Sequence, residues 1–136
     1  MPDWAQTHVI LKHRKPEMLQ RLLDAASTKH FFATTSPLQD GEDFGVFHTK
    51  WEPEIEIIDT EIKGGILIIF QTAWYAPTGW FMRMYVQDYN VDAWYADANQ
   101  RLVHWKNGEE IRSWDRTERK GVPRDIRDVF YWFWEQ

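Results

Sequence analysis

Alternating apolar and polar positions predict where the strands of this chain lie. In the segment Trp4–Lys12, every second residue from Ala5 to Leu11 is apolar or small, which is typical of a strand with one face against a core. Similar patterns predict strands over Trp51–Ile62, Ile66–Trp74, Val91–Asp97, Leu102–Lys106 and Glu109–Trp114. The segment Ile66–Trp74 is apolar on both faces for most of its length, so we expect it in the middle of a sheet.

Turn residues and one break in the pattern refine these strands. Lys63-Gly64-Gly65 supplies turn residues for a hairpin, and Asn107-Gly108 is a strong signal for a type I′ hairpin turn. Ile58 interrupts the Glu/Ile alternation of its strand, which predicts a bulge or a change of face there.

Three prolines mark the starts of predicted helices. Pro16, Pro77 and Pro123 each precede apolar residues at helical spacing, and a proline fits the first helical turn because its missing N–H would have no partner there. The polar stretch 28–45 is predicted to be a long loop. Two strand–helix units with matching apolar stripes indicate a split βαβ arrangement. The predicted class is α+β, with an antiparallel sheet of five or six strands and helices mainly on one face.

The composition limits the classes of protein to consider. The 136 residues include nine tryptophans, more than a core of this size usually takes, so we expect some on a surface that something covers. The net charge of −5 argues against general capture of nucleic acid. The absence of cysteine suits the cytoplasm, and we expect no signal peptide. The longest apolar run, Ile66–Phe70, is too short to span a membrane.

Three short motifs stand out: Met1-Pro2-Asp3-Trp4, Thr49-Lys50-Trp51 and Thr72-Ala73-Trp74 with Pro77. They resemble motifs of the YubB-like ferredoxin-like domain family, small proteins of plasmids, phages and other mobile elements. His48, Tyr75 and Ala76 depart from the family pattern, and the resemblance covers roughly residues 1–110. It implies a ferredoxin-like two-layer sandwich without an iron–sulfur cluster, for which cysteines would be needed. We expect one domain over 1–136, with residues 115–136 as a C-terminal aromatic helix extension.

The strand ends place one group of candidate binding residues together. Trp51 precedes one strand and Trp74 ends the next, so a hairpin brings the two indoles to the same end of the sheet. With Lys50 and Trp80 they are the predicted binding residues, because neighbouring rings and an ammonium can hold a ring, a base or an arginine. The alternative is that Trp51 and Trp74 cap the open end of the sandwich, with Lys50 stacked along them.

The C-terminal segment carries more rings than one helix face can bury. Ile126, Val129, Phe130 and Phe133 form one stripe, which leaves Tyr131, Trp132 and Trp134 outside it. These three are the predicted partner interface, since Trp and Tyr dominate interface energetics. The alternative is a helix that is apolar all round and wedged between the sheet and a loop.

Other candidate chemistry has little support in the sequence. Glu54 and Glu56 alternate with isoleucine, as in a half-solvated strand. The histidines lack metal-binding spacing, and only a pairing of His8 with His48 is conceivable. No nucleophile motif, phosphate loop or RNA-binding signature is found, although Trp94 and Trp105 could present rings to bases. We therefore predict no cofactor, no metal and no catalytic residues.

These observations lead to a function hypothesis. The chain is expected to be a non-enzymatic interaction protein of a mobile element, which inhibits a host defence complex by surface occlusion. A basic host protein or complex suits an acidic, Trp-rich surface, and a second copy of the chain is a further candidate partner. The alternative is a small-ligand or nucleotide-binding module that uses Lys50, Trp51 and Trp74.

Overall fold

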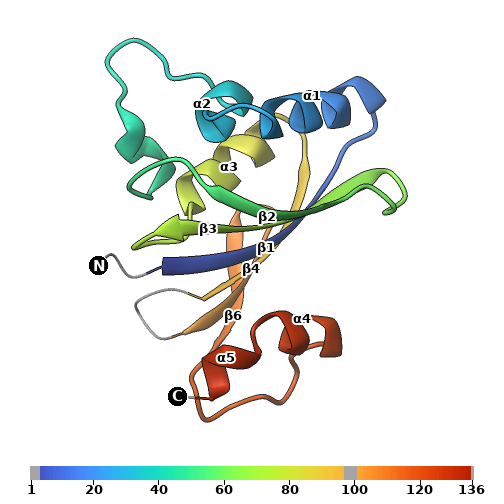
Figure 1. Ribbon diagram of the computed structural model, residues 1–136, viewed down its shortest axis with the longest axis vertical. Helices are drawn as coiled ribbons and strands as arrows, with labels where there is room; N and C mark the ends of the chain where they lie inside the picture. Colours follow the sequence, from blue (N-terminus) through green and yellow to red (C-terminus); the bar gives the residue numbers. More distant parts are fainter. Residues whose placement is uncertain (1–3, 97–100, 136) are drawn as a thin grey trace.

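One six-stranded antiparallel sheet organises the molecule (Figure 1). The computed structural model describes residues 4–96 and 101–135. The strands are β1 (Trp4–Lys12), β2 (Glu54–Asp59), β3 (Gly65–Ala73), β4 (Asn90–Ala96), β5 (Leu102–Lys106) and β6 (Glu109–Trp114). Their order in the sheet is β2-β3-β1-β4-β5-β6, and every neighbouring pair is antiparallel. The predicted α+β class and the antiparallel sheet are confirmed, and the third strand is an interior strand, second from the β2 edge. Met1, Pro2 and Asp3 of the first motif and Asp97 of the predicted fourth strand lie outside the described residues.

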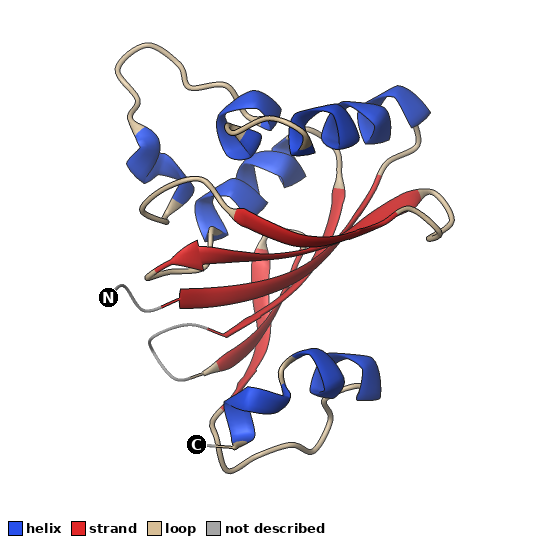
Figure 2. Cartoon of the chain, in the orientation of Figure 1, coloured by secondary structure: helices blue, strands red, loops and turns tan. Residues whose placement is uncertain are grey.

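Helices cover both faces of this sheet (Figure 2). They are α1 (Pro16–Ala26), α2 (Phe31–Thr35), the 3-10 helix η1 (Phe44–Phe47), α3 (Thr78–Val86), α4 (Arg124–Val129) and α5 (Tyr131–Trp134). The first four lie on one face, and α4 and α5 lie on the other (Figure 1). The expectation that helices lie mainly on one face therefore holds for residues up to 86, and the C-terminal helices form a separate layer.

The first four strands interleave two strand–helix–strand units. β1 and β2 run parallel with β3 between them, and β3 and β4 run parallel with β1 between them. Helix α1 follows β1 and α3 follows β3, which is the split βαβ arrangement. The β5–β6 hairpin then extends the sheet beyond β4. Its turn residues Asn107 and Gly108 have φ values of 46° and 100°, as a type I′ turn requires.

Alternation along β1 separates two cores. Thr7 and Val9 face α1 and α3, whereas Gln6 and His8 face α4 and α5. The larger core buries side chains from the sheet and from α1, α2, η1 and α3. It includes Leu11, Leu22, Phe31, Phe32, Phe47, Phe70, Trp80 and Phe81. The smaller core lies beneath α4 and α5 and contains Trp94, Ala96, Leu102, Trp114, Val122, Ile126, Phe130 and Phe133. The apolar stripe predicted for the C-terminal segment (Ile126, Val129, Phe130 and Phe133) thus packs on the sheet.

Three local predictions differ from the structure. The stretch 28–45 is not a loop throughout, because Phe31 and Phe32 are fully buried and α2 forms around them. The bulge in β2 lies between Ile55 and Ile57 rather than at Ile58. The predicted C-terminal helix is divided at Phe130 into α4 and α5. Within residues 4–96 and 101–135, none of the helices combines the length and the apolar character that crossing a membrane requires.

Candidate binding surface

Lys50 lies between two indoles at one end of the sheet. Its Nζ is 5.1 Å from the centroid of the Trp51 ring and 5.5 Å from that of Trp74. An ammonium over an indole face is attracted by the negative quadrupole of the ring. The hairpin that the sequence predicted does bring these three side chains together, since Trp74 directly follows β3 and Trp51 lies shortly before β2.

A tight turn after β3 sets the direction of the Trp74 ring. Trp74 has a φ of 71°, a left-handed conformation that costs free energy for a bulky residue. The turn is closed by two hydrogen bonds: Tyr75 N–H donates to Ala73 O at 2.9 Å, and Thr72 Oγ1 donates to Tyr75 O at 2.7 Å. These two hydrogen bonds, made by Thr72 and Ala73 at the end of β3, hold the backbone of Trp74 in this conformation.

The segment that carries Lys50 is tied to β3 and α3. Thr49 Oγ1 donates to Ala73 O at 3.1 Å, and the Nδ1 atom of His48 lies 3.0 Å from Thr78 Oγ1. His48 also has a left-handed φ of 65°, which ends η1 and turns the chain toward the sheet. These contacts fix the backbone of the segment that carries Lys50.

A cavity of about 510 Å³ opens beside these residues. It is lined by Gly45, His48, Thr49, Lys50, Trp74 and Tyr75. Within the described chain, the Trp74 Nε1 donor is buried and has no hydrogen-bond partner. A buried donor without a partner costs free energy unless something satisfies it. An acceptor on a bound molecule would satisfy it.

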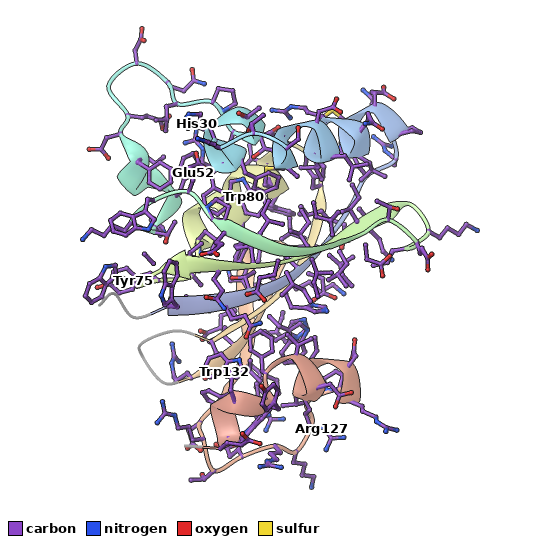
Figure 3. All side chains as sticks on the ribbon, in the orientation of Figure 1. His30, Glu52, Tyr75, Trp80, Arg127 and Trp132 are labelled. Carbon is purple, nitrogen blue, oxygen red and sulfur yellow. The ribbon has the colours of Figure 1, made fainter. Side chains whose placement is uncertain are left out.

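Trp80 does not line this cavity. It is fully buried in the larger core, where its Nε1 donates to Thr35 Oγ1 at 2.9 Å (Figure 3). Trp80 is therefore a core residue, while Trp51 is exposed and Trp74 is half-buried.

Glu52 is a second fixed residue of the same segment, and it was not predicted from the sequence. Its carboxylate accepts hydrogen bonds from Phe32 N at 2.6 Å and Ala33 N at 3.2 Å. Partial burial raises the pKa of Glu52, although the two amides oppose that shift. The contact joins the start of α2 to the residue after Trp51. No local pattern indicates it, because the partners lie about twenty residues apart.

The predicted interface residues of the C-terminal segment differ in their contacts. Tyr131 is exposed, whereas Trp132 and Trp134 are half-buried. Trp132 Nε1 donates to Gln6 Oε1 at 2.5 Å, and Trp134 Nε1 donates to Glu118 O at 2.6 Å. The two indoles are therefore fixed against the sheet and the preceding loop, which leaves Tyr131 as the freely presented ring.

A second cavity, of about 490 Å³, joins the C-terminal segment to the start of β1. Trp4, Gln71, Tyr131 and Trp132 are among its lining residues. Trp4 pairs with Ala73 in the sheet, so it lies next to the turn of Trp74 and Tyr75. We call the surface formed by Trp4, Lys50, Trp51, Trp74, Tyr75, Tyr131 and Trp132 the aromatic end. Figure 3 shows Tyr75 projecting beyond β3 and Trp132 between α5 and the sheet.

Other candidate groups do not converge. His8 is buried on the face of the sheet that α4 and α5 cover. His48 instead contacts Thr78 of α3, which lies on the opposite face of the sheet. Trp94 and Trp105 are both buried and belong to different cores, so neither presents its ring to a base. In the described part of the chain, no three His, Asp or Glu side chains come together in a group that could hold a metal ion.

Comparison of the chain with protein-family models, curated proteins and solved structures finds no match.

Proposed function

We propose that this chain is a non-enzymatic interaction protein that binds another protein through the aromatic end. The observation that carries the proposal is the exposure of four rings there: Trp4 is 42% exposed, Trp51 47%, Tyr75 53% and Tyr131 60%. Apolar area gathered on one surface is typical of interaction sites, and Trp and Tyr are the residues that most often dominate binding energy.

The rigidity of the aromatic end supports this role. Lys50, Trp74 and Trp132 are each held by contacts within the chain, so little conformational entropy is lost when a partner binds. The net charge of −5 favours a basic partner. The resemblance to the YubB-like family adds the proposal that this partner is a host defence complex, which the protein inhibits by covering its surface.

We also propose that the first four strands form a ferredoxin-like core. The order β2-β3-β1-β4, with α1 and α3 as the two crossover helices, supports this assignment. On this view the β5–β6 hairpin and helices α4 and α5 are additions to that core, and they contribute Tyr131 and Trp132 to the aromatic end.

Affinity capture from bacterial lysate tests the proposal when matched variants are compared. The bait variants are Tyr75→Ala, at the aromatic end, and Tyr85→Ala, which removes an equally large ring that is 42% exposed on α3 near Gly108. We expect a stoichiometric partner that the wild type and Tyr85→Ala capture and Tyr75→Ala loses. Capture of the same partner by both variants would place the interface elsewhere. The mass of the purified protein in solution shows whether the partner is a second copy.

A small-ligand function of the same end is the second candidate. The cavity beside Lys50 and the buried, unpartnered Trp74 Nε1 favour it. The expected ligand has a flat ring for Trp51 and an acceptor for Trp74. A metabolite screen by tryptophan fluorescence, repeated with Trp74→Phe, which removes the unpartnered donor, and with Lys50→Met, tests this function. A response that both variants retain in full excludes this cavity as the ligand site.

A further inference from the structure

A third cavity, of about 530 Å³, lies at the opposite end of the sheet from the aromatic end. β1 begins at Trp4 beside the aromatic end and finishes at Lys12, which lines this third cavity. The other lining residues that matter here are His13, Arg14, Lys63, Asp92 and Lys106. They come from the ends of β1 and β5, the β2–β3 turn and β4. We call this cavity the basic cavity.

The charge of the basic cavity is opposite to that of the whole chain. The chain has 21 acidic and 16 basic residues, yet Lys12, Arg14, Lys63 and Lys106 surround this one cavity. Among residues 4–96 and 101–135, none of these four cations forms an ion pair within 4.0 Å. Cations that repel one another in a concave site are stabilised when an anion enters it.

One carboxylate is held in a fixed position within this group of cations. Asp92 Oδ1 lies 2.6 Å from His104 Nε2, and the His104 ring in turn stacks on Trp94. The hydrogen bond from His104 lowers the pKa of Asp92 below its usual value, and Lys106 adds to that effect. Asp92 is therefore ionised at neutral pH, and its oxygens can accept hydrogen bonds from hydroxyl or amino groups.

The backbone around the basic cavity is fixed as well. His13 N–H donates to Gly64 O at 3.2 Å, which joins the end of β1 to the β2–β3 turn. The His13 ring accepts a hydrogen bond from Lys15 N–H at 3.0 Å and packs edge-on against Tyr89. Lys12 and Lys63 therefore project from segments that hold each other in place.

We propose that the basic cavity binds a small phosphorylated ligand that also carries hydroxyl groups, a sugar phosphate in chemical class. The four cations hold the phosphate, because ammonium and guanidinium groups form strong charge-assisted hydrogen bonds with its oxygens. Asp92 accepts from a hydroxyl of the sugar and orients the ligand. A volume of about 530 Å³ lies within the range of small-molecule sites.

Calorimetric titration with ribose 5-phosphate tests this proposal on the whole protein at pH 7 and about 0.15 M salt. The test variant is Lys63→Gln/Lys106→Gln, which removes two exposed cations of the cavity. The matched control is Lys29→Gln/Lys120→Gln, which removes two exposed lysines outside it and changes the net charge by the same amount. Thermal unfolding of both double variants establishes that they fold.

We expect the wild type and the control to bind ribose 5-phosphate and the test variant to bind it about tenfold more weakly or worse, as the loss of charge-assisted hydrogen bonds predicts. Ribose, which has the hydroxyls without the phosphate, is expected not to bind. Inorganic phosphate is expected to bind more weakly than the sugar phosphate and to share its dependence on Lys63 and Lys106. The proposal is overturned if ribose 5-phosphate gives no heat at millimolar concentration, if both double variants bind alike, or if ribose binds equally well. These outcomes are independent of the aromatic end.

Discussion

Trp94 and His104 lie face to face on neighbouring strands, with ring centroids 4.1 Å apart and an angle of 6° between the ring planes. They are directly opposite each other in the β4–β5 pairing. Trp94 also stacks on Trp114 of β6, at 5.2 Å, so three rings join three strands beneath α4 and α5. The His104 ring therefore connects the smaller core to Asp92 and the basic cavity.

Replacement of His104 by alanine is predicted to destabilise the fold. The change removes the stacked ring and the donor to Asp92, and we expect a loss of about 1–2 kcal/mol in the free energy of unfolding. Urea unfolding at pH 7 measures it. The control is His30→Ala, an exposed histidine whose loss should cost less than about 0.5 kcal/mol. Equal losses in the two variants would show that the stacking of His104 on Trp94 contributes nothing to the free energy of unfolding.

His8 is predicted to make stability depend on pH. It is buried beside α4, and burial lowers its pKa, although Asp125 and Asp92 act in the opposite direction. The unfolded chain therefore takes up a proton at His8 at a higher pH than the folded chain does. The free energy of unfolding should fall as the pH drops below the ordinary histidine value of about 6.5.

Urea unfolding of wild type and His8→Gln at about pH 7 and about pH 5.5 checks this sign. The variant lacks the titrating group, so the stability advantage of the wild type should be smaller at the lower pH. An advantage of the wild type that is the same at both pH values would contradict the buried, neutral state of His8.

Where local pattern alone determines structure, the sequence predicted it well. The alternation in Trp4–Lys12 gave both the strand and its buried face, and Asn107-Gly108 gave the hairpin turn. β5 and β6 have the predicted bounds. The proximity of Trp51 and Trp74 was also predictable, because it follows from the strand ends of a single hairpin.

Structure that depends on distant partners was not predictable. Helix α2 has five residues, too few for a periodic pattern, and its start is held by Glu52, twenty residues later. Trp80 was assigned to the surface because its direction depends on how α3 packs on the sheet. The basic cavity was missed for a similar reason: its cations are spread over three separate segments, and only the sheet brings them together.

The contact between α3 and η1 leads to a prediction for Gly79. A Cβ atom at this position would lie 2.0 Å from Val46 O and 2.9 Å from Phe47 C, both backbone atoms that cannot move independently. Gly79→Ala should therefore cost about 3 kcal/mol or more, although alanine favours a helix by about 1 kcal/mol over glycine. Thermal unfolding measures the loss.

Gly41→Ala is the control for Gly79→Ala. Gly41 has a left-handed φ of 85°, but no atom lies within 4 Å of its added Cβ. Its cost should be limited to the backbone conformation, about 1–2 kcal/mol. If Gly79→Ala is tolerated at least as well as Gly41→Ala, α3 does not pack closely on Val46 and Phe47. The position of the following segment, which carries Lys50, would then be wrong as well.

The C-terminal segment should separate into core and surface positions on substitution. Phe133 is buried in the smaller core, and Phe133→Ala should cost about 3–5 kcal/mol or prevent folding of that layer. Tyr131 is exposed, and Tyr131→Ala should change the free energy of unfolding by less than about 0.5 kcal/mol. Urea unfolding of the two variants measures the contrast. A large loss for Tyr131→Ala would make that ring part of the core and remove it from the aromatic end, because a ring that the fold requires is not free to bind a partner.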